Sequence, residues 1–576
     1  MKFILSYLKK YKFLVVLNIL SVFGFALVEL GIPTIMAKII DQGIAVGNMN
    51  YVYQMGIVMA IISVIGVLGT ILLGYYSSRI SSNITRDIRN DIFRKAQEFS
   101  HSEYDAFGVS SMITRTTNDA FQILQFTNTL LRTALLTPIM FLMSVVMIIR
   151  TNMALSGVLA VTIPFIVLGV LIIAKMSGPL SEVQQNKLDR LNRISRENLT
   201  GIRVIRAFGN DDHENERFAQ TNESYAKVSK KLFKLMAISQ PSFFLLLNIA
   251  IIALFWIASQ MISIGTLQVG ELVAFIEYLF HAMFSIMLFS MVFVMYPKAQ
   301  VSAHRIQEIL ETVSIIENPK EGITETKEEG LVEFEHVTFV YPDGEEPVLR
   351  DISFTARKGE MVAFIGSTGS GKSTLINLIP RFYDVTEGSI RIDGVDVRDY
   401  DLKALRSKIG FIPQKTRLFT GTISGNIKFG KKDASHGEIE HSTKVAQAYP
   451  FIKRKPKQFE EPISEGGANM SGGQKQRLSI ARAIVRKPEI YIFDDSFSAL
   501  DFKTDATIRA KLKEETVDSV VLVVAQRIGS ILEADKIIVL NEGEVVGIGK
   551  HEELLSSCEI YKEIALSQLS KEELAR

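Results

Sequence analysis

The chain is poor in cysteine and carries almost no net charge. Cys558 is the only cysteine among 576 residues, so no internal disulfide can form, and the soluble part of the chain fits a reducing cytosol. Lysine and arginine number 64 against 62 for aspartate and glutamate, a formal net charge of +2. The chain therefore lacks the basic field that draws proteins to nucleic acid, and we expect no nucleic-acid partner.

A cleavable signal peptide is also missing from the pattern at the N-terminus. Residues Met1–Lys12 carry an apolar stripe of Phe3, Ile4, Tyr7 and Leu8 among lysines, and no small-residue cleavage site follows. We interpret this segment as an interfacial helix that lies on the cytoplasmic leaflet of a membrane.

Long hydrophobic runs dominate the first half of the chain. Mean hydropathy is +0.21 and 47% of residues are hydrophobic, whereas the last 250 residues or so have the charge content of a soluble protein. Single cores rarely exceed about 250 to 300 residues, so a chain of this length predicts more than one domain. We predict a transmembrane domain over residues 1–312, a linker over 313–330 and a second domain over 331–576.

Six stretches meet or approach the roughly 20 apolar residues that cross a bilayer. They are Phe13–Ala37, Gln54–Tyr76, Thr133–Ile149, Ala154–Ala174, Ser242–Ala258 and Leu272–Tyr296. About six lysines and arginines lie between spans two and three, about a dozen between spans four and five, and none between five and six. The positive-inside rule then places both termini in the cytoplasm of a multi-pass protein of the cell membrane.

The two cytoplasmic connections keep a helical apolar period and contain few helix breakers. We predict that Ile80–Phe99 and Leu188–Phe208 extend the membrane helices into the cytosol as rods. The polar, glycine-containing segments Ser100–Ser111 and Phe208–Glu216 are the expected turns at their far ends. Such turns could contact a cytosolic domain.

Three ionisable residues fall inside predicted spans. Glu277 and His281 lie one helical turn apart on one face of span six, and Glu29 lies in span one. Intramembrane charges are expensive and often functional, so these residues are candidates for a translocation path. Pairing with neighbouring helices or interfacial water for structural reasons is an equally weighted alternative.

Beyond residue 331 the pattern changes to short β-rich runs. Met361–Ile365, Ile490–Phe493 and Val520–Ala525 are nearly continuous apolar runs, which is typical of strands in a parallel sheet covered on both faces. Ligands bind at the carboxyl edge of such α/β sheets, so the residues that follow these strands should share one crevice.

A full Walker A loop follows the first of these strands and opens a helix over Thr374–Ile379. Its members are Gly366, Ser367, Thr368, Gly369, Ser370, Gly371, Lys372 and Ser373, and we expect these residues and Thr374 to bind the nucleotide. The glycines let backbone N–H groups wrap phosphates, Lys372 reaches the outer phosphates, and the Ser373 hydroxyl is placed for Mg²⁺. The second strand delivers Asp494, which suits a Walker B metal carboxylate. The sequence therefore predicts that ATP or GTP binds with Mg²⁺.

A second glycine-rich segment precedes a helix over Lys475–Val485. It consists of Ser471, Gly472, Gly473 and Gln474. One nucleotide already fills the Walker A loop, so a second phosphate cradle in the same domain predicts that it faces a nucleotide held by another subunit. A plain turn before a helix is the simpler alternative.

Over essentially its whole length the chain resembles the exporter class of ABC transporters, as a half-transporter with the membrane domain first. The resemblance implies six transmembrane helices of the type I exporter fold fused to an α/β P-loop NTPase domain that binds ATP and Mg²⁺. It also implies that Gln414 is the Q-loop glutamine near the metal, that Tyr341 stacks on adenine, and that Ser498–Asp501, with Asp501, is the D-loop. Ser464–Gly467 is similar to the segment before the signature Ser471–Gln474.

The resemblance further implies how the two domains are coupled. The turn near Phe208–Glu216 would dock on the motor domain of a second half-transporter, and the turn near Ser102–Phe107 would contact both motor domains.

Two positions depart from the family's pattern. The glutamate that follows Walker B is here Asp495, and the switch histidine is here Gln526. A carboxylate withdrawn by about 1.5 Å is misplaced enough to cost on the order of 100-fold in rate, and an amide cannot carry imidazolium charge. The pairing resembles the degenerate subunit of heterodimeric multidrug exporters, which would hold ATP, cleave it poorly and complete the partner's active site with its own signature.

The leading interpretation is an ATP-driven exporter of amphipathic, cationic or neutral drugs and lipid-like compounds, embedded in the lipid bilayer and paired with a second half-transporter. A homodimeric lipid flippase or a peptide exporter stays open, although no peptidase-like domain precedes span one. A nucleotide-gated regulator without transport is the alternative of another class, and the intact signature argues against it.

Overall fold

The computed structural model describes residues 2–327 and 329–568, and its contacts divide the chain into two compact units. The first unit comprises the chain up to Gln97 together with Val109–Thr312. The second comprises the short segment Glu98–Gly108 and the chain from Val313 onwards. A piece of the N-terminal half of the sequence therefore belongs to the C-terminal unit.

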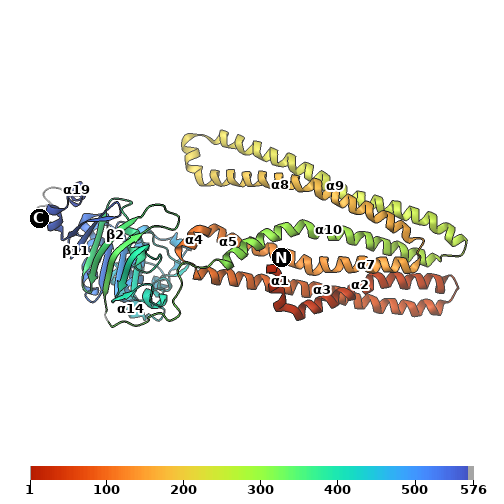
Figure 1. Cartoon of the computed structure of the whole chain (residues 1–576), viewed down its shortest axis with the longest axis horizontal. Coiled ribbons are helices and arrows are strands. Elements are labelled where there is room, and N and C mark those ends of the chain that lie inside the picture. The colour runs from red at the N-terminus through yellow and green to blue at the C-terminus, as the bar shows by residue number, and fades with distance from the viewer. Residues whose placement is uncertain (1, 328, 569–576) are drawn as a thin grey trace. The chain divides into compact units, whose positions relative to one another are not determined.

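The described part of the first unit is helical (Figure 1), and six of its continuous helical runs are long and apolar enough to cross a membrane, which confirms the predicted number. The elements are α1 (Lys2–Leu8), η1 (Lys9–Tyr11), α2 (Lys12–Lys38), η2 (Ile39–Ile44), α3 (Met49–Glu98), α5 (Val109–Thr114), η3 (Arg115–Asp119), α6 (Ala120–Thr129), η4 (Leu130–Ala134), α7 (Leu135–Thr151), α8 (Ser156–Phe208), α9 (Asp211–Ser263) and α10 (Val269–Glu311). Each predicted span lies inside one of these runs to within two residues.

The two predicted rods are confirmed as helix, because α3 continues to Glu98 and α8 to Phe208. The turn after α8 is tighter than the predicted Phe208–Glu216. Gly209 takes a left-handed conformation (φ 64°), and α9 begins at Asp211 after a single further residue. Asp211, Asp212 and Glu214 form the first turn of α9, where carboxylates are stabilised by the helix dipole. Acidic residues that suggested a loop are thus a helix start.

The other turn is also partly helical. Ser100 caps α4 (His101–Phe107) in a capping box with Glu103, and Gly108 (φ 72°) ends this helix before α5 begins. The predicted turn Ser100–Ser111 therefore contains a short helix that the polar sequence concealed.

Close backbone contact joins α2 and α3. A Cβ atom on Gly69 would lie 3.0 Å from backbone atoms of Gly24 and Phe25, and one on Gly66 would overlap the Val28 side chain. Such an approach permits only glycine, so this crossing is fixed by residues without side chains.

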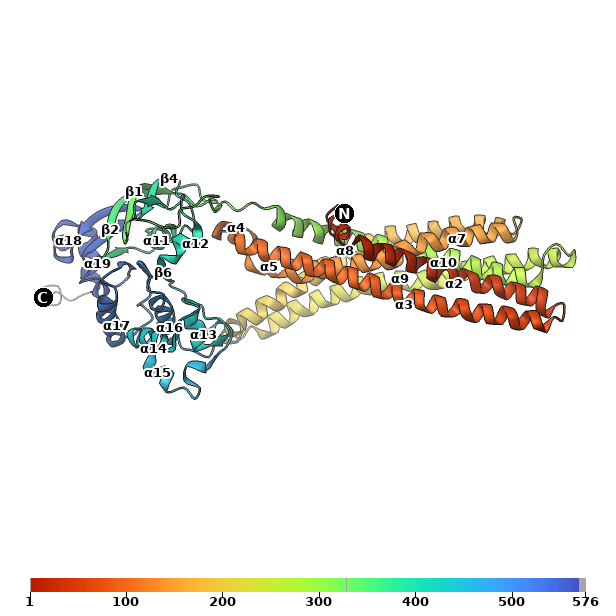
Figure 2. The ribbon, with the colours of Figure 1, turned by 90° about the horizontal axis from the view of Figure 1, so that it is seen from below.

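Helices α8 and α9 form a long antiparallel hairpin, side by side in both Figure 1 and Figure 2, and pack mainly on each other. At the N-terminus, the Tyr7 hydroxyl donates to Asp91 of α3 (2.8 Å) and the Tyr11 hydroxyl to Asp87 (2.7 Å). Ile4 and Tyr7 of the predicted interfacial segment are buried, and Met1 lies outside the described residues. The interfacial position itself stays a prediction.

The second unit is an α/β domain. Its helices are α4, α11 (Lys372–Leu378), α12 (Leu402–Ser407), α13 (Ile423–Lys428), α14 (His436–Val445), α15 (Tyr449–Lys453), η5 (Gln458–Glu460), η6 (Glu465–Gly467), α16 (Gly472–Ile484), α17 (Phe502–Glu515), η7 (Ile528–Ser530), α18 (His551–Ser557) and α19 (Glu559–Gln568). Its strands are β1 (Leu331–Phe339), β2 (Leu349–Arg357), β3 (Met361–Gly366), β4 (Glu387–Ile392), β5 (Val395–Asp396), β6 (Ile409–Ile412), β7 (Gly421–Thr422), β8 (Pro462–Ile463), β9 (Ile490–Asp494), β10 (Val520–Val524), β11 (Lys536–Asn541) and β12 (Glu544–Gly549).

The central sheet has the order β12-β11-β3-β10-β9-β6, and only β12 runs antiparallel to its neighbour. A four-stranded antiparallel sheet, β2-β1-β4-β5, packs beside it. The three predicted strands are β3, β10 and β9, which are adjacent in this order. Alternate residues of β3 face two different hydrophobic cores, Ala363 and Ile365 one of them and Val362 and Phe364 the other. The prediction of strands buried on both faces is confirmed.

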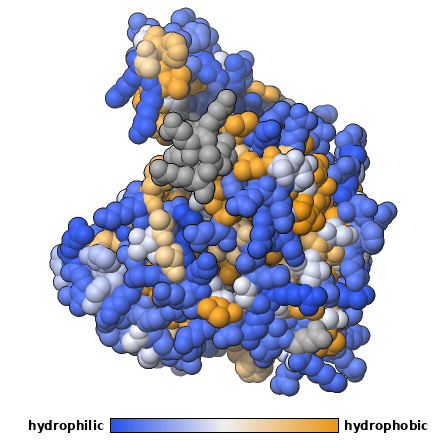
Figure 3. Space-filling view, turned by 90° about the vertical axis from the view of Figure 1, so that its left-hand side faces the viewer, coloured by the Kyte–Doolittle hydropathy of each residue, from blue (hydrophilic) through white to orange (hydrophobic). Residues whose placement is uncertain are grey.

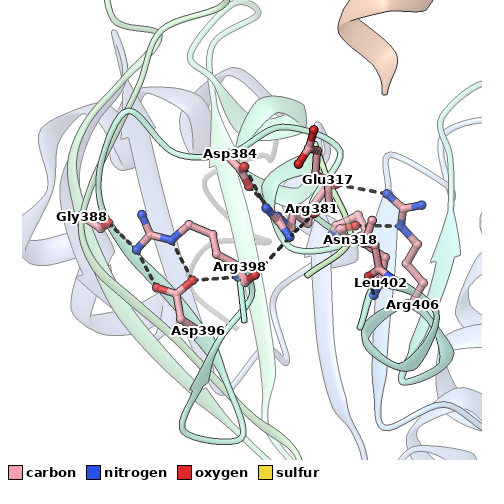
Figure 4. A network of polar contacts seen from close by, with 10 residues as sticks. Glu317, Asn318, Arg381, Asp384, Gly388, Asp396, Arg398, Leu402 and Arg406 are labelled. Atoms are coloured by element: carbon pink, nitrogen blue, oxygen red, sulfur yellow. Dashed lines mark hydrogen bonds and ion pairs between the residues drawn. The ribbon is translucent and has the colours of Figure 1, made fainter. Parts of the chain in front are cut away.

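The linker is held against the second unit. Ile323 exchanges backbone hydrogen bonds with Asp399 (2.9 Å) and Asp401 (3.0 Å). Figure 4 shows the Arg381 guanidinium paired with Asp384 (2.7 Å) while it donates to the carbonyls of Glu317 (3.4 Å) and Arg398 (3.2 Å). Arg381, a buried residue just after the Walker A helix, thus connects this part of the unit to the linker.

Segment Glu98–Gly108 also docks on this unit. The Glu103 carboxylate accepts hydrogen bonds from the Ile315 N–H (2.9 Å), the Ser314 hydroxyl (3.2 Å) and the Ser100 N–H (2.7 Å). Burial alone would raise the pKa of Glu103, but these hydrogen bonds outweigh it and lower that pKa. Glu103 therefore ties α4 to the linker as an ionised, satisfied carboxylate.

The His101 ring stacks on Phe382, with ring centroids 4.5 Å apart. Burial lowers the pKa of His101; the Arg406 guanidinium adds to this and Asp105 opposes it. The histidine is thereby kept neutral in its contact with an aromatic ring.

The face shown in Figure 3 differs in hydropathy from the exposed surface of the predicted membrane spans. That face is mostly hydrophilic, with apolar side chains in scattered patches. The predicted spans, in contrast, leave large apolar side chains such as Trp256, Phe165 and Leu68 exposed. Exposed apolar residues along six long helices are what a lipid environment accommodates.

Candidate nucleotide-binding site

The loop between β3 and α11 requires glycine at two positions. A Cβ on Gly366 would overlap the carbonyl oxygen of Leu540 on the neighbouring strand. Gly371 has φ 93°, and a Cβ there would lie 2.7 Å from the Leu349 side chain. The close approach of β11 and β2 therefore leaves no room for a side chain at these two positions, and the loop backbone takes a shape that can present N–H groups to phosphates.

Lys372 points back into the loop. Its ammonium donates to the carbonyls of Ser367 (2.6 Å) and Gly366 (3.0 Å) and to the Ser370 hydroxyl (3.2 Å). Burial lowers the pKa of Lys372, and the nearby carboxylates of Asp495 and Asp494 oppose that shift. An outer phosphate that enters the loop would give this buried cation the full counter-charge that carbonyl oxygens do not supply.

Ser373 and Asp494 form a pair of oxygen donors. The Ser373 hydroxyl donates to Asp494 Oδ1 at 2.9 Å, and Asp494 is buried at the end of β9. Burial raises the pKa of Asp494, with Asp495 adding to it and Ser373 and Lys372 opposing it. Among the described residues no three His, Cys, Asp or Glu side chains gather as a metal cluster. This hydroxyl and carboxylate fit Mg²⁺, which commonly takes one or two protein oxygens together with waters and substrate phosphates.

Two side-chain amides donate hydrogen bonds to the Asp495 carboxylate. Gln414 donates to its Oδ2 at 3.1 Å, and Gln526 donates to the same oxygen at 2.9 Å. The residue has φ 45°, a left-handed conformation that aspartate tolerates better than most residues, and its N–H donates to the Val524 carbonyl (3.0 Å). The structure thus brings together the three residues predicted for the Q-loop, the position after Walker B and the switch position.

Tyr341 lies beside the Walker A helix. Its hydroxyl is 3.0 Å from the Thr374 hydroxyl, and its ring packs edge to face against Tyr383 with centroids 5.3 Å apart. The ring is therefore held at the edge of the loop, where a flat aromatic surface can accept an adenine.

The signature segment is a capped helix start. Ser471 is the N-cap of the 13-residue helix α16. Its hydroxyl accepts the Gln474 N–H (3.3 Å), and the Gln474 side chain accepts the Ser471 N–H (3.1 Å). Ser471 and Gly472 are exposed. Asp501 caps α17 through the Thr504 N–H (2.9 Å). The start of α16 therefore lies at the surface, and its contact with a nucleotide of another subunit stays a prediction.

Two of the three ionisable residues predicted inside the spans lie together in the structure, and the third does not join them. Glu29 of α2 and His281 of α10 lie 3.4 Å apart (Oε2 to Nε2), whereas Glu277 is exposed on the same helix. One turn away, the hydroxyls of Thr34 and Tyr278 are 2.6 Å apart. Two polar contacts therefore join α2 to α10, and their part in a translocation path stays a prediction.

Sequence reasoning missed several residues that surround the site. The Thr416 hydroxyl, just after the Q-loop glutamine, donates to Gln476 of the signature helix at 2.6 Å. Gln568, in the last helix, hydrogen-bonds the backbone on both sides of Arg527. A capping-box spacing of Ser100 and Glu103 could have identified Glu103; no local pattern points to Gln476 or Gln568.

Comparison with known proteins matches both halves. Residues 15–295 match the family described as ABC transporter transmembrane region, and residues 349–498 match the family described as ABC transporter. An uncharacterized ABC transporter ATP-binding protein of Mycobacterium tuberculosis is 38% identical over 98% of this chain and 97% of its own length. The uncharacterized ABC transporter ATP-binding protein YfiB of Bacillus subtilis is also 38% identical, over 99% and 98%.

Two further matches bear on fold and on function. An ATP-dependent lipid A-core flippase of Syntrophus aciditrophicus is 32% identical over 83% of this chain and 79% of its own length. The structure of a bacterial Atm1-family ABC exporter with ATP bound superposes with a TM-score of 0.80 over 98% of each chain, at 24% identity. At that identity the superposition supports the fold alone.

Proposed function

The chain belongs to the ABC transporters, as an exporter half-transporter in which six membrane helices are fused to a P-loop ATPase unit, and from this premise we propose that it is the degenerate-site subunit of a heterodimer. ABC exporters work as dimers and drive export with ATP. In the proposed complex this chain holds ATP with Mg²⁺ and cleaves it poorly. Its Ser471–Gln474 segment closes over the partner's nucleotide and completes the partner's active site.

The observation that carries the proposal is the environment of Asp495. A carboxylate that orients an attacking water must be directed at the phosphate, and hydrogen bonds to one of its oxygens fix the direction of the side chain. The Oδ2 atom of Asp495 already accepts two amide N–H groups, from Gln414 and Gln526. The side chain is also one methylene shorter than the family's glutamate, and Gln526 offers no positive charge to the γ-phosphate.

Binding, in contrast, has everything it needs. The loop around Gly366 and Gly371, the ammonium of Lys372 and the oxygen pair of Ser373 and Asp494 offer backbone donors, counter-charge and metal ligands. When bound, Mg²⁺ supplies charge neutralisation between the phosphates. Retention without efficient cleavage follows from this division of the site.

The test is a pair of matched substitutions in the assembled complex. Lys372→Ala should weaken nucleotide retention on this chain and leave part of the transport, whereas the equivalent lysine change in the partner should abolish transport. The asymmetry is expected because only the partner's site does efficient chemistry. Equal loss in both variants would show that the two sites are equivalent and would refute the degenerate assignment.

For the transported compound we propose amphipathic drugs or lipid-like molecules, with cationic members favoured. The support is the acidic Glu29 and Glu277 on helices that reach across the first unit, with His281 beside Glu29. A carboxylate within an apolar path attracts a cation strongly because little water screens it. Glu29→Gln and Glu277→Gln should reduce export of a cationic dye and spare a neutral one of similar size.

Coupling between the units of two subunits is proposed through the α8–α9 turn. Phe208, at the end of α8, is 80% exposed, and Phe419 and Phe429 are exposed on the ATPase unit beside Arg482. Phe419 and Phe429 lie side by side (ring centroids 4.7 Å apart), and apolar side chains that gather on a surface often mark an interaction site. We propose that the turn at Phe208 covers such a surface on the partner's ATPase unit, as the family resemblance implies.

A homodimeric lipid flippase is the second candidate, and the 32% identity to a lipid A-core flippase favours it over a peptide exporter. A nucleotide-gated regulator without transport is the candidate of another class. Purification of the chain alone separates these alternatives from the proposal. A homodimer with ATP turnover on the order of 1 to 10 per second would support the flippase, since this is an ordinary rate for enzymes. ATP binding without any substrate-dependent turnover in the native complex would support the regulator.

A further inference from the structure

The last helix of the chain is anchored next to the loop that carries Gln526. Tyr561 and Ala565 of α19 are fully buried and belong to the same hydrophobic core as Ile528 and Ile531. The Tyr561 hydroxyl is also 2.7 Å from His551 Nδ1, which fixes the turn between α18 and α19. The C-terminal end of α19 is therefore held at a defined place beside the loop after β10.

Gln568 bridges that loop. Its Nε2 donates to the Gln526 carbonyl (2.8 Å), and its Oε1 accepts the Ile528 N–H (2.9 Å). Residues 525–527 lie between β10 and η7 and belong to neither element. One side-chain amide thus satisfies two backbone groups of an otherwise irregular segment, as a neighbouring strand would do.

The bridged loop reaches two parts of the nucleotide site. The Gln526 side chain donates to Asp495 Oδ2 (2.9 Å). The Arg527 guanidinium lies over the Phe502 ring (5.2 Å to its centroid) and donates to the Ser498 carbonyl (3.5 Å). Ser498 and Phe502 flank Asp501, the predicted D-loop residue, so a displacement of the loop would change both contacts together.

We propose that Gln568 is a positioning residue of the nucleotide site, which holds the loop after β10 so that Gln526 faces Asp495 and Arg527 faces the segment that leads to Asp501. The Gln568 side chain contacts the backbone of the loop, and it acts through Gln526. Through this bridge the position of α19 sets how well this chain retains ATP. The inference rests on the proposed function in one respect, the expectation that retention rather than turnover is the quantity to measure here.

The experiment uses the full-length complex purified through a tag on this chain. Retention is measured as the loss of 8-azido-ATP photolabelling from this chain, in Mg²⁺, after dilution into excess ATP. Gln568→Leu removes both hydrogen bonds at nearly constant size, and Gln568→Glu keeps the acceptor for the Ile528 N–H and loses the donor. Ser567→Ala is the matched control, because within residues 2–327 and 329–568 the Ser567 hydroxyl hydrogen-bonds to Ile564 of its own helix and not to the loop after β10.

A neutral hydrogen bond is worth about fivefold in an equilibrium, so we expect nucleotide loss to accelerate about fivefold to tenfold in Gln568→Leu and about half as much in Gln568→Glu. Ser567→Ala should behave as wild type, and all variants should keep the wild-type melting temperature. In a Gln526→Ala background, Gln568→Leu should add less than about twofold, because the side chain through which it acts is gone.

Three results would overturn the inference. They are unchanged retention in Gln568→Leu, an equal acceleration with and without Gln526, and an acceleration that follows only a drop in melting temperature. A failure of the proposed function looks different, since wild-type label on this chain would then be hydrolysed at the partner's rate. In that case the coupling of Gln568 to Gln526 is read from turnover instead, and its presence or absence decides the inference in the same way.

Discussion

Asp494 and Asp495 are adjacent at the end of β9, and we expect substitution by asparagine to have different effects at the two positions. At Asp494 it should weaken nucleotide retention, and at Asp495 it should change ATP turnover little. Asp495→Asn replaces a carboxylate that accepts two amide N–H groups with an amide oxygen that can accept both. Hydrogen bonds to charged groups are worth about 1.5 to 3 kcal/mol and neutral ones about 1, so the ATPase unit should lose about 2 kcal/mol of stability. Asparagine also tolerates the left-handed conformation at this position, so no further strain is expected.

The catalytic effect of Asp495→Asn should be small. If this carboxylate does not activate water, ATP turnover by the complex should fall by less than about threefold, whereas loss of a working general base costs about 100-fold or more. Asp494→Asn is the matched control. It removes the carboxylate paired with Ser373. Substitutions of residues that only support metal ligands already cost about 10-fold to 100-fold in affinity, so this change should weaken Mg²⁺-dependent retention on this chain by about 100-fold.

Steady-state ATPase assays, photolabelling of this chain and thermal unfolding of the same preparations supply the three measurements. A 100-fold loss of turnover in Asp495→Asn with normal retention would refute the reasoning, because the carboxylate would then be doing chemistry despite its amide partners. An unchanged Mg²⁺ requirement in Asp494→Asn would refute the metal assignment.

Further predictions concern the packing of α4 within the second unit, the contact between α2 and α3, and ATP hydrolysis at this chain's own site. The folded-state pKa of His101 is lowered, so its contribution to docking is complete above the ordinary value of 6.5 and is lost as the pH falls below it; the protection of the α4 amides, relative to their intrinsic exchange rate at each pH, should fall between pH 7.5 and 5.5, and should not fall in His101→Phe. Gly69→Val should separate α2 from α3 and lower the thermal stability of the first unit by about 1 to 3 kcal/mol, while Gly74→Ala, where a Cβ meets nothing within 4 Å, should not. Asp495→Glu with Gln526→His should give at best a modest gain in single-turnover hydrolysis at this site, since cleavage also needs the partner's signature; a fast, independent ATPase would contradict this.

Much of the architecture could be predicted because its signals are local and periodic. Twenty-residue apolar runs predicted six spans, and the all-apolar runs that became β3, β9 and β10 predicted a sheet covered on both faces. The Walker A residues form one continuous segment, so their shared location needed no tertiary information. Chemistry that is written in consecutive residues can be identified before the fold is known.

Turn boundaries were predicted less well, for a physical reason. Asp211, Asp212 and Glu214 are polar and suggested a loop, but the same carboxylates stabilise a helix N-terminus. Ser100 and Glu103 likewise form a capping box inside a segment predicted as a turn. Composition alone does not distinguish a polar loop from a polar helix start.

Contacts between distant residues were beyond any local pattern. Gln568 and Gln526 are separated by 42 residues, and Glu103 and Ile315 by 212. Neither pair has a sequence signature, because a glutamine or a glutamate acquires its role from the backbone groups that folding places within its reach. The position of Glu103, in a segment that joins the second unit, was visible only once the fold was known.

The geometry at the end of β9 explains how binding and cleavage can be separated in one site. Asp494 is the last strand residue and faces Ser373 and the Lys372 ammonium, where metal and phosphates act. Asp495 has a left-handed backbone and accepts the amide N–H groups of Gln414 and Gln526, and its charge, like that of Asp494, acts on the Lys372 ammonium. The two carboxylates share no hydrogen-bond partner, so we expect a substitution at position 495 to act first on Gln414 and Gln526 and to leave the Ser373–Asp494 hydrogen bond in place. In the proposed heterodimer, this subunit would keep its nucleotide while its partner does the hydrolysis.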